Sequence, residues 1–308
     1  MALPDQCPLC GADAAEQNVL SRHVYGAPPH ISCFRCGTCE VTYLHPVLTP
    51  EEKAQFYAEE FPAFMAGRAP DKGGWDESDE HVRANEPQRQ RRMRYLERLL
   101  PAPDGRILDV GCASGFMLYP LAERGFHCAG VEPAERFADY VRGRGLPCFE
   151  NWDALLGDPI GADGFDLIMH FFVLDHVAEP AAFLREQVAA LRPGGRLVVE
   201  INSTDDAMLS VYGIDAFERF FYEVAQNYYF SYTSLGVLLD QVGAPYEILR
   251  DQHYDLSNHL TWALDGRPGG SGRFTDRLGA GIEDAYRAAL VEAGTCDTLI
   301  GVVHKRAR

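Results

Sequence analysis

The sequence predicts an α/β protein built around a mostly parallel sheet. Residues 107–115 (ILDVGCASG) have the pattern of a buried strand, a glycine turn and the start of a helix. Residues 164–170 and 196–201 have the pattern of strands that are apolar on both faces, as in a covered sheet. The apolar residues of 180–191 recur near helical spacing, and this alternation predicts parallel crossover units. Residues 298–305 suit a last strand, antiparallel at the edge of the sheet.

The glycine turn has the chemistry of a nucleoside-binding site. Gly111 lets the backbone turn sharply and lets a ligand approach, and Gly115 lies where the N–H groups of the next helix point outward. Asp109 closes the strand, and Glu132 follows a second strand-like run, at a distance where an acid can bind ribose hydroxyls. The middle glycine of the dinucleotide pattern G-x-G-x-x-G is absent, and the charge of Asp109 favours an amino or sulfonium group over a pyrophosphate.

The segment LDVGCASG resembles the first motif of class I S-adenosylmethionine-dependent methyltransferases, with Ala113 where the usual form has glycine. The segments FDLI, VLDHVAEP and LRPGGRLVVEIN are similar to later segments of the same class, in the same order, and the matches cover most of residues 105–202. This resemblance implies a Rossmann-like fold with a seven-stranded, mostly parallel sheet over residues 105–308. It also implies an enzyme that uses S-adenosylmethionine (SAM) as methyl donor.

By position, the resemblance further implies the contacts with SAM. The methionine end would contact the glycine turn, and Glu132 would bind the ribose. The adenine would face residues after a third strand near 147–149, and the sulfonium would lie at the end of the fourth strand. The implied residues are Asp109, Gly111, Cys112, Gly115, Glu132, Asn151, Trp152, His170 and Phe171. Trp152 suits the core equally well, and Phe171 is also an ordinary core candidate.

The first forty residues hold five of the nine cysteines, in a pattern typical of a zinc site. Cys7 and Cys10 form one C-x-x-C pair, and Cys33, Cys36 and Cys39 offer two choices for the second. A tyrosine and a proline shortly after the last cysteine resemble zinc-ribbon methyltransferases, which favours Cys7, Cys10, Cys36 and Cys39 and leaves Cys33 spare. Because a four-thiolate zinc site has no open position for water, we expect residues 1–50 to form a small structural zinc ribbon.

Two places carry groups that could take a proton from the acceptor. His176 follows the fourth strand and an imidazole titrates near neutrality, although a structural role fits the same position. Residues 220–231 resemble the Y-x-E-H…Y-F-S segment of zinc-ribbon sugar C-methyltransferases. Tyr222 and Glu223 match that segment, and Val224 stands at its histidine. Those enzymes continue into a further C-terminal domain, which we expect this chain to lack.

Composition limits the partners of the protein. Hydrophobic residues make up 46% of the 308 residues, enough for a core, and no apolar run approaches the length of a membrane span. The formal net charge of −17 opposes phosphate backbones and argues against nucleic acid as substrate. The N-terminus lacks the basic and apolar stretches of a signal peptide, so we expect a cytoplasmic enzyme.

Residues 51–104 read as a helical lid or linker before the methyltransferase domain. They include a Pro/Gly loop at 69–75 and an arginine-rich helix whose apolar residues predict one core-facing side. The arginines are then expected on the solvated side, with contact to an anionic substrate such as a nucleotide-sugar diphosphate as the alternative. These arginines are Arg83, Arg89, Arg91, Arg92, Arg94 and Arg98.

Together these patterns predict methyl transfer from SAM to a small molecule by direct displacement. We expect a sugar nucleotide or a secondary metabolite as the acceptor, with His176, Tyr222 or Glu223 deprotonating or orienting it. One alternative is a ribosomal or transfer RNA methyltransferase. Others are a SAM-binding protein without methyl transfer and an enzyme that catalyses another reaction in the same pocket. The acceptor atom and the oligomeric state stay open.

Overall fold

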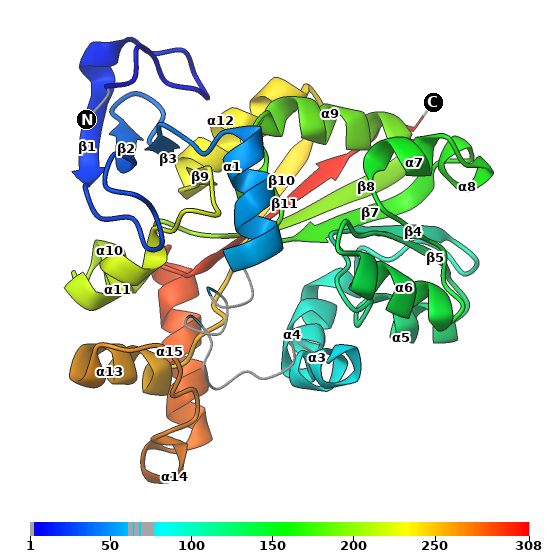
Figure 1. Ribbon diagram of the computed structural model, residues 1–308. Helices are drawn as coiled ribbons and strands as arrows, with labels where there is room; N and C mark the ends of the chain where they lie inside the picture. The colour runs from blue at the N-terminus through cyan, green and yellow to red at the C-terminus, as the bar shows by residue number, and fades with distance from the viewer. Residues whose placement is uncertain (1–2, 61–63, 65–67, 69–76, 308) are drawn as a thin grey trace.

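The computed structural model describes residues 3–60, 64, 68 and 77–307 (Figure 1). Its main sheet has seven strands in the order β10-β11-β8-β7-β4-β5-β6. The strands are β4 (Arg106–Val110), β5 (His127–Val131), β6 (Cys148–Phe149), β7 (Phe165–Phe171), β8 (Leu191–Asn202), β10 (Tyr246–Asp251) and β11 (Thr298–His304). The strands from β4 to β8 pair in parallel, and β11 runs antiparallel to β8. The predicted Rossmann-like, seven-stranded, mostly parallel sheet is therefore confirmed.

Strand β8 begins before the Pro-Gly-Gly segment that was expected to precede it. Leu191 already pairs with Phe165, and the register then shifts so that Arg196 pairs with Leu167. Gly194 has a φ of +81° within this stretch, a conformation that glycine adopts without strain. The segment is thus a bulge inside the strand rather than a loop before it.

The last strand was expected at the edge of the sheet, and this prediction is wrong. β11 lies between β8 and β10, and it pairs antiparallel with both. The edge position belongs to β10, which the sequence analysis missed. Its sequence, YEILRD, mixes charged and apolar residues because an edge strand is only partly covered, so it lacks the continuous apolar run of the buried strands.

Helices cover both faces of the sheet (Figure 1). They are α4 (Glu86–Leu96), α5 (Leu118–Glu123), α6 (Glu135–Gly143), α9 (Pro180–Ala190) and α12 (Tyr232–Val242). Successive strand residues point to opposite faces. Leu108 and Ile168 therefore enter the core formed with α9 and α12, whereas Ile107 and Leu167 enter the core formed with α4, α5 and α6. The two cores hold the strand ends in fixed positions at one edge.

The N-terminal segment forms a second, smaller sheet. It contains β1 (Gln17–Ser21), β2 (Ser32–Cys36) and β3 (Thr42–His45), joined by β9 (Tyr228–Tyr229) in the order β1-β2-β3-β9. Because β9 comes from the C-terminal half of the chain, the small sheet is built from two distant segments. Helix α1 (Pro50–Gln55) follows, and the predicted Pro/Gly loop at 69–75 lies outside the described residues.

The remaining helices are short or lie after the central strands. They are α3 (Ser78–Ala84), α7 (Trp152–Leu156), α8 (Pro159–Ala162), α10 (Ala207–Ser210), α11 (Asp215–Phe221), α13 (Leu256–Asp265), α14 (Thr275–Leu278) and α15 (Ala280–Ala293), with single turns at Ala14–Glu16, Phe56–Glu60 and Leu174–His176. Figure 1 shows α13, α14 and α15 grouped together. None of the helices in the described part of the chain combines the length and hydrophobicity needed to cross a bilayer.

Two of the arginines expected on the solvated side of α4 are instead buried. Arg91 and Arg92 are 5% and 4% exposed, and both contact Glu200 of β8, which is fully buried. Arg91 Nη2 lies 2.6 Å and Arg92 Nε 3.1 Å from Glu200 Oε1. The expectation is wrong for these two residues because a carboxylate in the sheet interior requires compensating charge, which α4 supplies.

Candidate active site

The carboxyl ends of β4 and β5 bring together five of the residues that were expected to bind the cofactor. They are Asp109, Gly111, Cys112, Gly115 and Glu132. The N–H groups of Gly111 and Cys112 both donate to the carbonyl of Val131, at 2.7 and 3.2 Å. These bonds join the loop after β4 to the end of β5, so the glycine turn and Glu132 form one continuous edge. The regular helix after the turn, α5, begins only at Leu118.

The turn is closely packed and has positive φ angles, so its backbone suits glycine. Gly111 has a φ of +74°, and a Cβ atom there would lie 2.6 Å from Val173 Cγ2. Ala113, at the position where the family motif has glycine, also has a positive φ, +47°. Its N–H donates to Glu132 Oε2 at 2.8 Å. The turn is therefore retained at Ala113, in a conformation that few non-glycine residues adopt.

The two acids of the site are buried but differ in their partners. Glu132 accepts hydrogen bonds from the N–H groups of Ala113 and Ala134, each at 2.8 Å, while burial raises the pKa of its carboxyl. Asp109 is 2% exposed, and its Oδ1 has no hydrogen-bond partner among the described residues. Burial raises the pKa of Asp109 to about 8, although Arg92 acts in the opposite direction. A buried carboxyl with an unused oxygen fits a ligand that brings a cationic hydrogen-bond donor.

Asn151 and Trp152 lie beside this edge. They follow β6, which pairs in parallel with β5, and the N–H of Glu132 donates to the carbonyl of Phe149 at 2.8 Å. The side chain of Asn151 caps α7 by accepting from the N–H of Ala154 at 2.8 Å. Trp152 is half-buried, and its indole N–H has no hydrogen-bond partner among the described residues. The cap fixes the first turn of α7, which carries the Trp152 indole next to the end of β5.

The structure separates His170 from the other residues of the expected cofactor site. By strand alternation, His170 lies on the same face as Ile168, opposite Asp109, and its ring is 5.5 Å from that of Phe183 of α9. It is fully buried, and burial lowers its pKa to about 3, so the ring is neutral. Phe171 points to the Asp109 face, where the guanidinium of Arg92 lies 4.0 Å above its ring.

A histidine that the sequence offered no reason to select also reaches the glycine turn. His81 of α3 is 6% exposed, and its Nδ1 lies 2.8 Å from Ser114 Oγ. Burial, reinforced by the charge of Arg136, lowers the pKa of His81 to about 4. A neutral His81 thus fixes the hydroxyl of Ser114, and helix α3 packs directly over the turn.

A second cluster of polar groups surrounds His176. His176 Nδ1 lies 2.8 Å from the carbonyl oxygen of Ala225, which can only accept, so in the neutral ring the proton is assigned to Nδ1. The carbonyl of His176 itself accepts from Lys53 Nζ at 2.7 Å and from Asn227 Nδ2 at 3.1 Å. His176 Nε2 lies 4.0 Å from Asp175 Oδ2. The imidazole is therefore held in one tautomer whose Nε2 lone pair can accept a proton.

Tyr222 and Glu223 point in opposite directions, because they are neighbours in extended backbone after α11. Tyr222 is 4% exposed and packs in an apolar cluster with Cys33 and Leu44. Glu223 is 6% exposed, and Arg68 Nε lies 2.8 Å from its Oε2. That contact is an ion pair without hydrogen-bond geometry, so the oxygen can still accept a hydrogen bond. The structure thus places Glu223, but not Tyr222, with the polar groups.

Burial raises the pKa of the Glu223 carboxyl, while the charges of Arg68 and His176 lower it. Arg68 also lies 3.9 Å above the ring of Phe220. On the other side of His176, Gln226 Nε2 donates to Asp175 Oδ2 at 2.6 Å. Arg68, Gln226 and Lys53 were missed by the sequence analysis because each contact joins residues far apart in the chain, and no local motif marks them.

Four of the five N-terminal cysteines converge. The sulfur atoms of Cys7, Cys10, Cys36 and Cys39 all lie within 4.8 Å of one another. Cys7 and Cys39, like Cys10 and Cys36, have their sulfurs 3.7 Å apart. A tetrahedral site with zinc–sulfur bonds of about 2.3 Å has sulfur–sulfur edges of about 3.8 Å, so the donor set fits that metal. Cys33 is fully buried in the apolar cluster with Tyr222 instead.

The comparisons with known proteins identify the class of the enzyme. The sequence profile of a family described as a methyltransferase domain matches residues 83–247, more than half of the chain, so the chain belongs to this family. The chain therefore contains a methyltransferase domain, built on the Rossmann-like sheet described above.

Relatives with similar sequences carry names from one biosynthetic activity. The chain is 33% identical over 133 residues to a ubiquinone biosynthesis O-methyltransferase of Xylella fastidiosa, a match that covers 40% of this chain and 53% of the relative. A protein with the same name from Marinobacter nauticus is 30% identical over 115 residues, covering 35% and 48%. The chain thus spans about half the length of the curated relatives it matches.

Solved structures show the same fold at low sequence identity. The plantazolicin methyltransferase BamL, solved with a triazolic desmethylPZN analog and SAH, has a TM-score of 0.51 at 13% identity, over 82% of this chain and 94% of that chain. The complex between the Haloferax volcanii Trm112 methyltransferase activator and the putative methyltransferase gives 0.50 at 18% identity, over 74% and 95%. These similarities support the methyltransferase fold.

Proposed function

We propose that the enzyme transfers the methyl group of SAM to a hydroxyl oxygen of a small organic acceptor, with His176 as the general base. The observation that carries this proposal is the hydrogen bond from His176 Nδ1 to the Ala225 carbonyl, which makes Nε2 the basic nitrogen of the neutral ring. The names of the relatives support oxygen as the accepting atom. The acceptor belongs to the sugar nucleotides or the secondary metabolites, the classes that the sequence favours.

The residues around the glycine turn would hold the cofactor, which supplies a methyl group on a sulfonium when bound. Asp109 contacts the ammonium group, because its Oδ1 is buried and has no partner among the described residues. Glu132 binds the ribose hydroxyls with the acceptor capacity that two backbone N–H groups leave. The remaining contacts come from Gly111, Cys112, Gly115, Asn151, Trp152 and Phe171. His170 supports the sheet from its other face.

The groups around His176 would position the acceptor and stabilise the charge that the proton brings. When Nε2 takes the acceptor proton, the imidazolium is stabilised by the Ala225 carbonyl and by the nearby Asp175 carboxylate. Glu223 orients the acceptor hydroxyl through its Oε2, while Arg68 keeps the carboxylate in place. Tyr222 fills the apolar cluster behind this site and makes no contact with the acceptor.

The proposal is tested by incubating the purified enzyme with labelled SAM and a metabolite extract, followed by mass spectrometry. We expect label in a low-molecular-weight product whose fragments place the added methyl group on oxygen. Label on carbon would contradict oxygen as the accepting atom and would indicate the chemistry of the sugar C-methyltransferases instead. Tight cofactor binding without label in any fraction would contradict the proposal.

Asp109→Asn is expected to weaken binding of S-adenosylhomocysteine roughly ten- to a hundredfold, because it removes one charge-assisted hydrogen bond. In the unliganded enzyme the pKa of Asp109 is about 8, so a cationic ligand must displace a proton at neutral pH. The affinity of the wild type should therefore rise with pH toward about 8, and that of the variant should not. Titration calorimetry across this range measures both effects, with Asp276→Asn on α14 as the surface control. If the wild type and Asp109→Asn show the same pH dependence of affinity, Asp109 does not contact the cofactor.

We also propose that Cys7, Cys10, Cys36 and Cys39 bind a structural zinc ion. Purified protein is expected to contain about one zinc per chain, since four thiolates complete the coordination. Cys39→Ser should lose the metal and lower the melting temperature, because metal binding is coupled to folding in such small modules. Cys33→Ala is the matched variant and should retain the metal. Elemental analysis measures the zinc content of each variant. Retention of zinc by Cys39→Ser would show that other residues bind the metal.

A further inference from the structure

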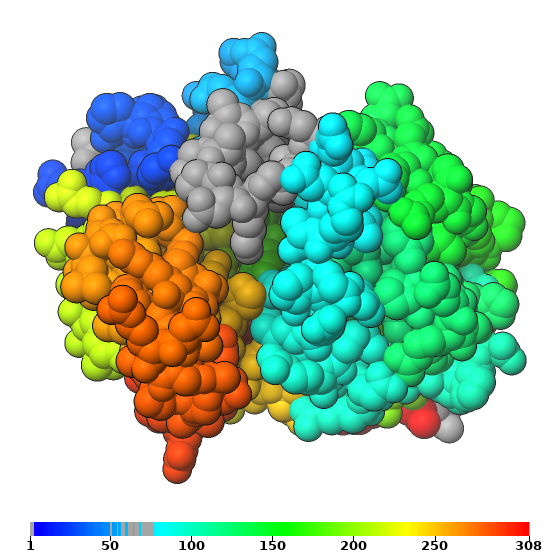
Figure 2. All heavy atoms as spheres, turned by 90° about the horizontal axis from the view of Figure 1, so that it is seen from below, coloured from blue at the N-terminus to red at the C-terminus, as the bar shows by residue number. Residues whose placement is uncertain are grey.

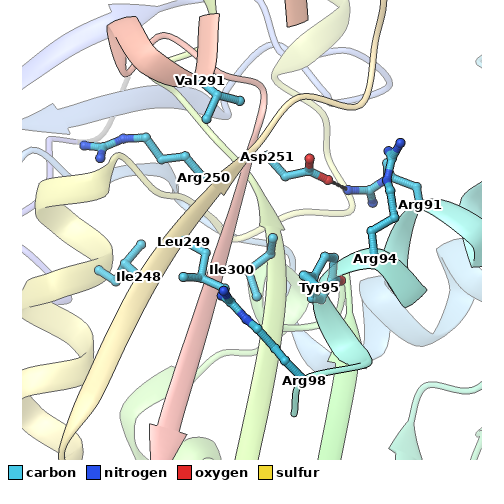
Figure 3. A pocket seen from close by; sticks show the side chains of 10 residues that line it. All are labelled: Arg91, Arg94, Tyr95, Arg98, Ile248, Leu249, Arg250, Asp251, Val291 and Ile300. Carbon is cyan, nitrogen blue, oxygen red and sulfur yellow. Dashed lines mark hydrogen bonds and ion pairs between the residues drawn. The ribbon is translucent and has the colours of Figure 1, made fainter. Parts of the chain in front are cut away.

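A cleft of about 500 Å³ lies between α4 and the edge strand β10 (Figure 3). Its lining residues are Arg91, Arg94, Tyr95, Arg98, Ile248, Leu249, Arg250, Asp251, Val291 and Ile300. Figure 2 shows the surface hollowed between the helices that follow β10 and those that precede β4. This volume is in the range of pockets that bind small organic molecules.

One wall of the cleft is cationic. Arg94 and Arg98 are exposed, and neither has an ion pair or a hydrogen bond among the described residues. Among the described residues that line the cleft, Asp251 is the only one with a carboxylate, and it is already paired with Arg91. In Figure 3 the side chain of Arg98 extends from the end of α4 toward β10. In a protein with a formal net charge of −17, two exposed guanidinium groups from residues one helical turn apart, neither paired with a carboxylate among the described residues, are available to an anion.

The opposite wall is apolar. Leu249 of β10, Ile300 of β11 and Val291 of α15 contribute its surface. Arg250 adds no charge there, because its guanidinium lies 4.0 Å above the ring of Tyr232 on the far side of the strand. An anion with an apolar body therefore fits both walls better than an inorganic ion alone.

We propose that this cleft binds a small organic phosphate. Arg94 and Arg98 contact the phosphate oxygens, for which the planar guanidinium is well suited, and Leu249 and Ile300 contact the body of the molecule. Such a site is separate from the groups around Asp109 and His176, and neither arginine belongs to the proposed methyl-transfer machinery.

The cleft begins at the end of the sheet that holds the active site, where the parallel strands have their carboxyl ends. Asp251 ends β10 and pairs with Thr298, which pairs in turn with Asn202 at the carboxyl end of β8. The phosphate could therefore belong to a distant part of the acceptor, or to a separate small molecule. Only the first of these two sources rests on the proposed function.

The first experiment measures binding alone. Phenyl phosphate is titrated into the full-length wild type and into the double variant Arg94→Gln/Arg98→Gln. We expect the Kd to rise at least about tenfold in the double variant, equivalent to about 1.4 kcal/mol. Inorganic phosphate should bind the wild type more weakly than phenyl phosphate. Arg277→Gln, which removes an exposed arginine of α14, is the control and should bind like the wild type.

Equal affinity of the double variant and the wild type would overturn the proposal, and so would a wild type that does not bind phenyl phosphate at low millimolar concentration. Both side chains are exposed, so unfolding is not expected, and a melting curve checks this. A failure of methyl transfer is seen in the labelling assay, so the two proposals fail separately.

The second experiment assigns the source of the phosphate. It compares the steady-state kinetics of the double variant and the wild type on the acceptor found in the extract. A raised KM with unchanged kcat shows that the acceptor itself carries the bound phosphate. An unchanged KM, together with weakened phenyl phosphate binding, shows a separate ligand.

Discussion

Replacement of His176 by asparagine is expected to lower kcat by about 10²- to 10⁴-fold, the range typical for loss of a general base. The Kd of S-adenosylhomocysteine should change little, because His176 is not among the residues proposed to hold the cofactor. Asparagine is the informative substitution, since its amide can still donate to the Ala225 carbonyl while it has no basic nitrogen. Single-turnover kinetics with labelled SAM measures the chemical step directly.

Glu223→Gln serves as the comparison for this variant. The amide keeps a carbonyl that can accept from the acceptor hydroxyl, but it loses the charge that pairs with Arg68. We expect a raised KM and a smaller fall in kcat than for His176→Asn. If Glu223→Gln instead suffers the larger loss of kcat, Glu223 is the base and His176 holds a structural position.

Replacement of Glu200 by glutamine is expected to destabilise the fold by about 3–5 kcal/mol, the range for removing one partner of a buried ion pair. Glu200 is fully buried and accepts from Arg91, Arg92 and the hydroxyl of Tyr95. Without its charge, the buried guanidinium of Arg92 would lose its only ion pair among the described residues, whereas Arg91 retains Asp251. Chemical denaturation at constant pH measures the free energy of unfolding.

The stability difference between the wild type and Glu200→Gln is expected to depend on pH. Burial alone would raise the pKa of Glu200, but the charges of Arg92 and Arg91 outweigh it and hold the pKa below its ordinary value. A carboxyl with a lowered folded-state pKa stabilises the fold fully above its unfolded pKa of about 4.3, and the contribution disappears as the pH falls through the folded value. The difference between wild type and variant should therefore shrink in acid.

Glu247→Gln on β10 is the control for Glu200→Gln. Glu247 is exposed, its only ion pair among the described residues is with His304 at 3.8 Å, and surface changes of this kind usually stay within about 0.5 kcal/mol. A Glu200→Gln variant as stable as this control would show that the buried arginines find other compensation.

The sequence could predict the parts of the site that depend on short runs of contiguous residues. The strand, glycine turn and following acid depend on local backbone requirements, so Asp109, Gly111 and Glu132 could be placed at one sheet edge. Two C-x-x-C pairs were likewise anticipated from the cysteine spacing, whereas the choice of Cys36 and Cys39 over Cys33 came from the resemblance to zinc-ribbon methyltransferases. Helix α4 shows the limit of such patterns: its arginines look solvated until Glu200, more than a hundred residues later, is known to lie beneath them.

Most of the surroundings of His176 could not be predicted, because its described partners other than Asp175 are distant in the chain. Lys53, Ala225 and Asn227 approach it from a helix and from an irregular segment that carry no motif. Tyr222 and Glu223 were grouped on a shared family segment, but extended backbone turns neighbouring side chains to opposite sides, so Tyr222 packs in the apolar cluster and Glu223 contacts Arg68. Likewise, the position of β11 within the sheet depends on β10, whose pattern alone is weak.

Strand β9 links the cysteine cluster to the chemistry of the active site. Tyr228 and Tyr229 extend the small sheet through β3, and the carbonyl of Asn227 accepts from the N–H of Leu44. The residues immediately before them hold Asp175 and His176. The small sheet therefore fixes the position of the segment that contacts His176, the proposed proton acceptor. Disturbing the N-terminal module should lower kcat while the affinity for SAM is unchanged. Loss of the metal would therefore affect the rate of methyl transfer rather than cofactor binding.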